Sequence, residues 1–131
     1  MKRYQFNKLI RSNLPKRMRQ EGIKLSILNL NQDGFAKALK SKLVEESLEV
    51  KDTNSRDHLI KELADVMEVI KSLTSIYNIS KEEINREQLL KSKINGHFSP
   101  RNFIKYIKVP ENNSKMIRYL EDKNRLYQFV E

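Results

Sequence analysis

Two acidic clusters, separated by twelve residues, contain the side chains with which this sequence could perform chemistry. The first runs Glu45-Glu46-Ser47-Leu48-Glu49 and the second runs Glu62-Leu63-Ala64-Asp65. Residues three positions apart share one face of an α-helix. Glu46 and Glu49 would therefore form one acidic pair, and Glu62 and Asp65 would form another. Paired carboxylates of this kind are the ligands that hard divalent cations prefer in proteins.

The apolar pattern around the two pairs indicates that some of these carboxylates lie against a helix interface. On helical wheels, Glu46 and Glu62 fall inside the apolar stripes of their helices. Glu49 and Asp65 fall at the margins of the same stripes. An ionised carboxylate that is unpaired in such a place is costly, so some cation must compensate it.

A divalent ion held by oxygen, Mg²⁺ or Mn²⁺, would provide this compensation. The chain has no cysteine, and its two histidines are far apart in the sequence, which disfavours a zinc site. The alternative is that the acids are solvated and paired with lysines such as Lys42 or Lys61. We prefer the metal site because the two pairs occupy matching positions on their helices, and buried charges are paired or bind metals.

The surrounding sequence predicts a mainly α protein in which an antiparallel helical hairpin carries the two clusters. A capping box of Ser80 and Glu83, flanked by Ile79 and Ile84 as a hydrophobic staple, marks the clearest helix start. Alternating residues predict a short strand or extended segment at 24–30 and a short strand at 103–109. We expect a short helix that begins at Pro15 and ends at Gly22, and a helix over 35–50 that follows a cap at Asn31 or Asp33. Further helices are expected over 58–77, from Ser80 to near Gly96, and over 114–129.

Charge is distributed unevenly along the 131 residues, whose net charge is +9. The stretch from Glu45 to Glu87 has a net charge of −5, and the rest of the chain has +14. This arrangement fits a metal site surrounded by cations that bind a phosphorylated ligand, and it also fits a basic surface with one acidic face. No window could span a membrane, and no apolar signal segment follows Met1. We expect a soluble, cytoplasmic, single domain over residues 1–131 without a membrane partner.

The sequence resembles the MazG-type, all-α nucleoside triphosphate pyrophosphohydrolases, in particular the phosphoribosyl-ATP pyrophosphohydrolase-like branch. The family motif EExxE, a spacer and ExxD is matched by Glu45-Glu46-x-x-Glu49 and Glu62-x-x-Asp65. A family stretch like YNKLVRDKIP is matched by Phe6 to Pro15, and a late K-x-x-x-R-G-G-F is matched by Lys91 to Phe98. The resemblance covers a core of residues 4–107.

This resemblance implies a Mg²⁺-dependent hydrolysis of a nucleotide substrate to a nucleoside monophosphate and pyrophosphate. It implies that a water is positioned or deprotonated by Glu45, for which an ordinary exposed acid is the alternative. The metal ligands would be Glu46, Glu49, Glu62 and Asp65, and the substrate-binding residues would be Lys8, Arg11, Lys91, Lys93, Gly96 and Phe98.

Some positions depart from the family pattern. Ser12 replaces an aspartate, and Asn95 and His97 replace the arginine and second glycine of Arg-Gly-Gly-Phe. Lys93 or Arg101 would have to replace that arginine. The substrate is therefore not fixed by the motif, and the alternative function is a catalytically weakened basic module that binds nucleotide or nucleic acid. Of these partners, nucleic acid is not favoured.

Residues 111–131 lie beyond the resemblance and predict an extra C-terminal helix. Its apolar face includes Met116, Leu120, Tyr127 and Val130. Such a face must be buried somewhere, so we expect it to dock on the core or to contact a second copy. The thin core of the helical hairpin and the resemblance together imply a homodimer or a higher homo-oligomer.

Overall fold

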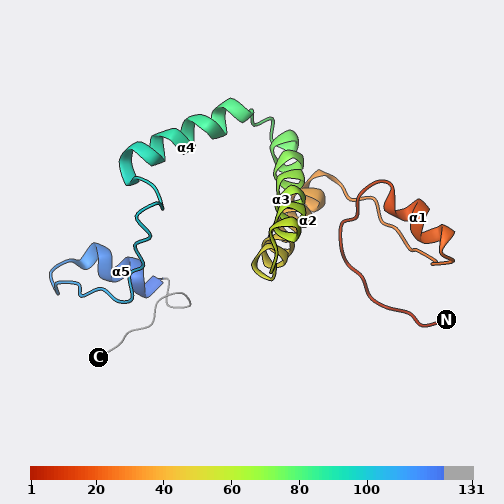
Figure 1. Ribbon diagram of the computed structural model, residues 1–131, viewed down its shortest axis with the longest axis horizontal. Helices are drawn as coiled ribbons and strands as arrows, with labels where there is room; N and C mark the ends of the chain where they lie inside the picture. Colours follow the sequence, from red (N-terminus) through yellow and green to blue (C-terminus); the bar gives the residue numbers. More distant parts are fainter. Residues whose placement is uncertain (123–131) are drawn as a thin grey trace. The chain divides into compact units, whose positions relative to one another are not determined.

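The structure is a computed structural model that describes residues 1–122. Within these residues it contains α-helices and no strand, so the expectation of a mainly α protein is confirmed. Figure 1 shows the helices in chain order, which are α1 (Leu14–Gln20), α2 (Gln32–Lys51), α3 (Arg56–Ile76), α4 (Lys81–Asn95) and α5 (Ser114–Asp122).

The chain divides into two compact units, Met1–Lys93 and Ile94–Glu131. The division falls inside α4, near its carboxyl end. The first unit contains both acidic clusters, and the second contains α5 and the segment that leads to it. A single domain over residues 1–131 stays a prediction.

The helix boundaries follow the capping residues of the sequence. Asn31, rather than Asp33, caps α2, because its side-chain Oδ1 accepts a hydrogen bond from the backbone N–H of Gly34 at 2.9 Å. The start of α3 lies earlier than expected because Ser55 is its N-cap and accepts a hydrogen bond from the backbone N–H of His58. Pro15 lies in the first turn of α1, and Gly22 beyond that helix has a positive φ of 82°.

The capping box of α4 forms as expected. The backbone N–H of Ser80 donates to Glu83 Oε2 at 2.7 Å, and the backbone N–H of Glu83 donates to Ser80 Oγ at 3.1 Å. The hydrogen bond from the Ser80 backbone holds the pKa of Glu83 below its usual value. At the other end of α4, Gly96 adopts a positive φ of 78°, the left-handed conformation that commonly ends a helix.

The strand predicted over 103–109 is wrong, and 24–30 also forms no strand. Each segment has the alternating pattern of a strand, but no second segment pairs with it in residues 1–122. A strand needs such a partner to satisfy its backbone N–H and C=O groups. These segments therefore run as irregular chain. The residues expected at the end of the C-terminal helix, including Tyr127 and Val130, lie outside the described residues.

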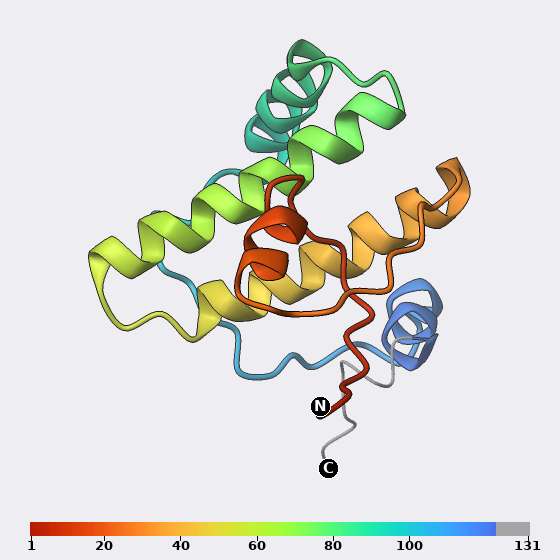
Figure 2. The ribbon, with the colours of Figure 1, turned by 90° about the vertical axis from the view of Figure 1, so that its right-hand side faces the viewer.

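Helices α2 and α3 form the main packing contact of the first unit and run in opposite directions (Figure 2). The turn between them runs from Asp52 to Ser55. Among the described residues, Ala36, Leu39 and Val69 are the buried apolar side chains, and all three belong to these two helices. The hairpin therefore contains the small core on which the position of the acidic side chains depends. No helix within residues 1–122 combines the length and the apolar character needed to cross a bilayer.

Candidate metal centre

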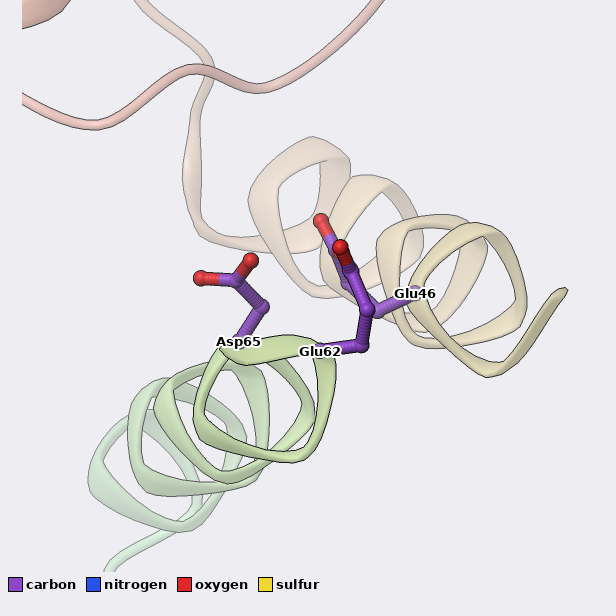
Figure 3. A group of neighbouring side chains, drawn as sticks. All are labelled: Glu46, Glu62 and Asp65. Carbon is purple, nitrogen blue, oxygen red and sulfur yellow. The ribbon is translucent and has the colours of Figure 1, made fainter. Parts of the chain in front are cut away.

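Three of the four predicted ligands converge where α2 packs on α3. Glu46 comes from α2, Glu62 and Asp65 come from adjacent turns of α3, and one carboxylate oxygen of each lies within 4.8 Å of the others. Figure 3 shows the carboxyl groups of Glu46 and Glu62 side by side, with the carboxyl group of Asp65, also from α3, apart from them. Acids of both clusters therefore lie together at these three positions, and their role as metal ligands stays a prediction.

The burial of these acids follows the helical wheels. Glu46, inside its apolar stripe, is the one charged residue among those described that is buried. Glu62 is mostly buried, since its side chain is only 16% exposed. Asp65, at the stripe margin, has a side chain that is 40% exposed. Glu49 lies on α2 as predicted but is exposed and outside the group of three, so its role as a ligand stays a prediction.

Lys42 compensates the acidic charge of α2 one turn before the site. Its Nζ lies 3.2 Å from Glu46 Oε1 and 3.1 Å from Glu45 Oε1. Burial by itself would lower the pKa of Lys42, but the hydrogen bonds and charges of Glu45 and Glu46 outweigh it and raise the pKa above its usual value. The lysine partner considered in the sequence analysis is thus present, and Lys42 stays charged beside the site.

Glu45, the predicted catalytic residue, lies between two lysines. Lys8 Nζ and Lys42 Nζ each lie 3.1 Å from its Oε1. Burial by itself would raise the pKa of Glu45, but these two cations outweigh it and hold the pKa below its usual value. Glu45 is therefore an ionised carboxylate at neutral pH. Both lysines contact the same oxygen, so within residues 1–122 no ion pair engages Oε2.

The N-terminal segment brings two predicted phosphate-binding cations to the acids. Lys8 contacts Glu45, and an Arg11 guanidinium nitrogen donates to Asp65 Oδ1. Asn7, just before Lys8, has a positive φ of 46°, a conformation that asparagine adopts more readily than most residues. This irregular segment therefore reaches both helices of the hairpin through charged side chains, Glu45 on α2 and Asp65 on α3.

His58 is a residue at the site that the sequence analysis missed. Its Nε2 lies 3.1 Å from Glu62 Oε1, one helical turn away on α3. The i,i+4 spacing of His58 and Glu62 was visible in the sequence and could have placed the imidazole on the same face.

The remaining predicted substrate-binding residues take no part in the contacts described above. Lys91 lines a hollow along α4 together with Ile79, Ile84 and acidic and amide side chains of the helix. Lys93 is exposed near the end of α4, and Gly96 and Phe98 belong to the second unit. Phe98 is fully exposed. The left-handed backbone falls on Gly96 and not on His97, so the histidine that replaces the second family glycine requires no strained conformation.

The three acids are close enough together to hold a small divalent ion once their side chains move. In an octahedral Mg²⁺ site neighbouring oxygens are about 3.0 Å apart and opposite ones about 4.2 Å, since each Mg–O bond is about 2.1 Å. The three carboxylate oxygens lie within 4.8 Å of one another, so the side chains would draw closer together around an ion. All donors are hard oxygens, which suit Mg²⁺ or Mn²⁺. The ion would replace Lys42, Arg11 and His58 as the partner of the acids.

Comparisons of the chain with known protein families, with characterised proteins and with solved structures find no match in any of the three. The resemblance to MazG-type pyrophosphohydrolases therefore stays a prediction from three short motifs. The geometry of the acids is independent of that resemblance, because it follows from the packing of α2 on α3.

Proposed function

We propose that this protein is a Mg²⁺-dependent nucleotide pyrophosphohydrolase of the all-α type. It would hydrolyse a nucleoside triphosphate, or a related nucleotide, to a monophosphate and pyrophosphate. The observation that supports this most strongly is the convergence of Glu46, Glu62 and Asp65 from two helices, with Lys8 and Arg11 beside them. Acids that bind a divalent ion and cations that bind phosphates are the two parts that phosphoanhydride hydrolysis needs.

The neighbouring cations have a second role in this proposal. Without an ion, Arg11 and Lys42 neutralise Asp65 and Glu46. When bound, the divalent ion supplies charge neutralisation for the phosphates and acidifies a water. The acids that bind the ion then no longer need their side-chain partners, and Arg11 becomes available for phosphate oxygens. A guanidinium binds two such oxygens at once, which orients the substrate at the site.

Glu45 would orient the attacking water. Its lowered pKa keeps it ionised, and its Oε2 can accept a hydrogen bond from a water while the lysines hold Oε1. The water oxygen would form a bond to the α-phosphorus, the bond from that phosphorus to the bridging oxygen would break, and pyrophosphate would leave. The proton of the water would pass to Glu45 or to solvent.

The decisive experiment begins with the metal and then adds substrate. Mn²⁺ and Mg²⁺ are titrated against the wild type and against Glu62→Gln, and pyrophosphate release is then measured with a panel of canonical and modified nucleotides. We expect ion binding by the wild type and activity that Glu62→Gln lowers by about a hundredfold. Glu68→Gln is the matched control, because Glu68 is an exposed acid on the same helix outside the cluster. Its activity should equal that of the wild type.

Two results would contradict the proposal. If neither ion binds, or if Glu68→Gln weakens binding as much as Glu62→Gln, the three acids are a network of ion pairs and not a metal site. If ions bind but no nucleotide of the panel releases pyrophosphate, the weakened binding module considered above becomes the better description.

We further propose that the protein assembles as a homodimer through α3. Besides the face packed on α2, this helix has a second apolar stripe, formed by Leu59, Leu63, Met67 and Ile70 at helical spacing. All four are exposed. A second copy of the chain would cover this stripe. The cytoplasmic location stays a prediction.

A further inference from the structure

The second unit contains a basic aromatic segment, residues 101–108, with the sequence Arg-Asn-Phe-Ile-Lys-Tyr-Ile-Lys. It lies within a stretch without acids, since no Asp or Glu occurs between Glu87 and Glu111. That stretch contains five basic residues. Inside the segment a three-residue pattern repeats, because an aromatic residue, an isoleucine and a lysine occur twice in succession at 103–105 and 106–108.

The aromatic side chains of this segment are exposed. Phe103 is 88% and Tyr106 is 69% exposed, and Ile104 and Ile107 are exposed with them. The segment forms neither helix nor strand, and at its start Arg101 adopts a positive φ of 61° in a turn closed by a hydrogen bond from its N–H to the Phe98 carbonyl. Within the described residues, no ion pair engages the side chains of Arg101, Lys105 or Lys108.

We propose that the basic aromatic segment binds single-stranded nucleic acid without sequence preference. Aromatic rings exposed to this degree can stack on unpaired bases, which is sequence-tolerant because every base has a flat face. Basic residues interleaved with the rings can contact the phosphates between those bases. The absence of acids from residues 88–110 removes the repulsion that phosphates would otherwise meet. The segment acts independently of the acidic site and leaves the proposed hydrolysis in place.

Two other anionic partners fit the segment less well. A membrane surface is usually bound by an amphipathic helix whose apolar and basic faces are opposite each other, and this segment contains no helix. Double-stranded nucleic acid offers phosphates, but its bases are already stacked on one another in the duplex. They cannot stack on the rings of Phe103 and Tyr106. The combination of exposed rings and alternating lysines therefore favours single strands.

The test measures binding of a labelled oligothymidylate to the full chain by fluorescence anisotropy, in EDTA so that no metal takes part. With three basic residues in the segment, the logarithm of the affinity should fall with the logarithm of the salt concentration with a slope of about −2. Phe103→Ala with Tyr106→Ala should weaken binding by at least tenfold at an unchanged slope, since about a tenfold loss is typical for one stacked base. Lys105→Gln with Lys108→Gln should reduce the slope to about −0.7.

Matched controls separate this binding from general basicity and from the acidic site. Lys37→Gln with Lys71→Gln removes the same charge from exposed positions of α2 and α3 and should leave the affinity within twofold of the wild type. Glu46→Gln should bind as the wild type does. The proposal is overturned if the oligonucleotide does not bind, if a duplex binds with equal affinity, or if phosphatidylserine vesicles bind and the oligonucleotide does not. It is also overturned if the control lysine pair loses as much affinity as the segment variants, or if Glu46→Gln loses binding.

Discussion

Glu46 is the charged side chain that the described part of the chain buries, and its neighbours decide what its carboxylate can do. Lys42 lies one turn away on the same helix, and Glu62 lies opposite on α3. Lys42 pairs with Glu46, and Arg11 pairs with Asp65. The partner of Glu62 is the imidazole of His58, so the three carboxylates have more negative charge than Lys42 and Arg11 balance. This excess charge is the physical reason why the site should prefer a divalent ion to the ion pairs.

The two neighbouring acids of α2 should therefore differ as ligands. Glu46→Gln removes a buried carboxylate of the group of three and should weaken Mn²⁺ binding by about tenfold or more, about 1.4 kcal/mol. Glu49→Gln removes an exposed carboxylate outside that group and should weaken it by less than about threefold. Calorimetric titration of Mn²⁺ compares the two variants. Equal losses would show that the fourth acid of the sequence motif joins the site when the ion binds.

Glu45 should contribute to stability in a pH-dependent way. Its pKa is held below 4.5 in the folded chain by Lys42 and Lys8, against the opposing effect of burial. The ion pairs therefore stabilise the fold above pH 4.5 and lose their effect as the pH falls below that value. At pH 7, Glu45→Gln should lower the free energy of unfolding by about 0.5–1 kcal/mol.

Urea unfolding of the wild type and of Glu45→Gln at neutral and acid pH measures this effect. The difference between them should shrink as the pH is lowered from 7 to about 3, because the wild-type carboxyl becomes protonated. Glu68→Gln, an exposed acid with no ion pair within the described residues, should show no such trend. A difference that is constant with pH would mean that the substitution acts through packing.

The site could be predicted to the extent that helical periodicity determines which side chains share a face. Spacing alone placed Glu46, Glu62 and Asp65 at one interface, and the three meet there. It could not place Lys8 and Arg11, because an irregular segment has no fixed period; only the resemblance suggested them. Glu49 and Asp65 occupy equivalent wheel positions, yet only Asp65 joins the group, and Glu49 is exposed. The wheel of one helix does not show which of its positions the other helix faces.

At the level of elements, capping residues decided where helices begin. Asn31, Ser55 and Ser80 each accept a hydrogen bond from an N–H in the first turn of the following helix. These contacts are local, so the sequence within four residues is enough to predict them. The failed strand at 103–109 has the opposite cause, since a strand needs a distant partner that a local pattern cannot supply.

Ser80, the N-cap of α4, should contribute more to the stability of this helix than Ser92 does. Ser80→Ala removes the acceptor for the Glu83 N–H and should destabilise the first turn of α4 by about 1 kcal/mol. Ser92 lies inside the same helix, where its Oγ donates to the Gln88 carbonyl that the helix already uses. Ser92→Ala should therefore be neutral or slightly stabilising, because alanine is the better helix former.

Amide hydrogen exchange at the start of α4 distinguishes the two serine variants. Exchange in the first turn should accelerate about fivefold in Ser80→Ala and stay unchanged in Ser92→Ala. Faster exchange along the whole helix in Ser80→Ala would mean that α4 forms or melts as one unit.

The small core of the hairpin should be sensitive to loss of volume. Leu39 is the most buried of the described residues, and Leu39→Ala should lower the free energy of unfolding by about 2–3 kcal/mol. Val44→Ala, at an exposed position of the same helix, should change it by less than about 0.5 kcal/mol. Urea unfolding measures both. If both substitutions lower the free energy of unfolding only slightly, the contact between α2 and α3 contributes little to stability.

At the scale of the whole molecule, the balance of buried and exposed apolar side chains supports the proposed dimer. Three buried apolar residues are few for residues 1–122, while α3 keeps an apolar stripe exposed. A specific interface buries about 800 Å² on each partner, which a stripe of four large side chains and its surroundings can supply. A twofold dimer that pairs α3 with itself is the simplest assembly that covers it.

Sedimentation velocity over a range of concentrations should show this dimer in the wild type. Leu63→Lys with Met67→Lys places two charges in the middle of the stripe and should convert the protein to a monomer, because a desolvated lysine without a partner is costly. Glu68→Lys changes the charge of an exposed position on a different face of α3 from the stripe and should leave the dimer intact. A wild type that sediments as a monomer at every concentration would show that α3 is not a dimer interface. A dimer that survives the paired lysines would place the interface on another face of the chain. Because Glu62 and Asp65 lie on the same helix, loss of the dimer should also loosen the acidic site, which the Mn²⁺ titration of the lysine variant would detect as weaker binding.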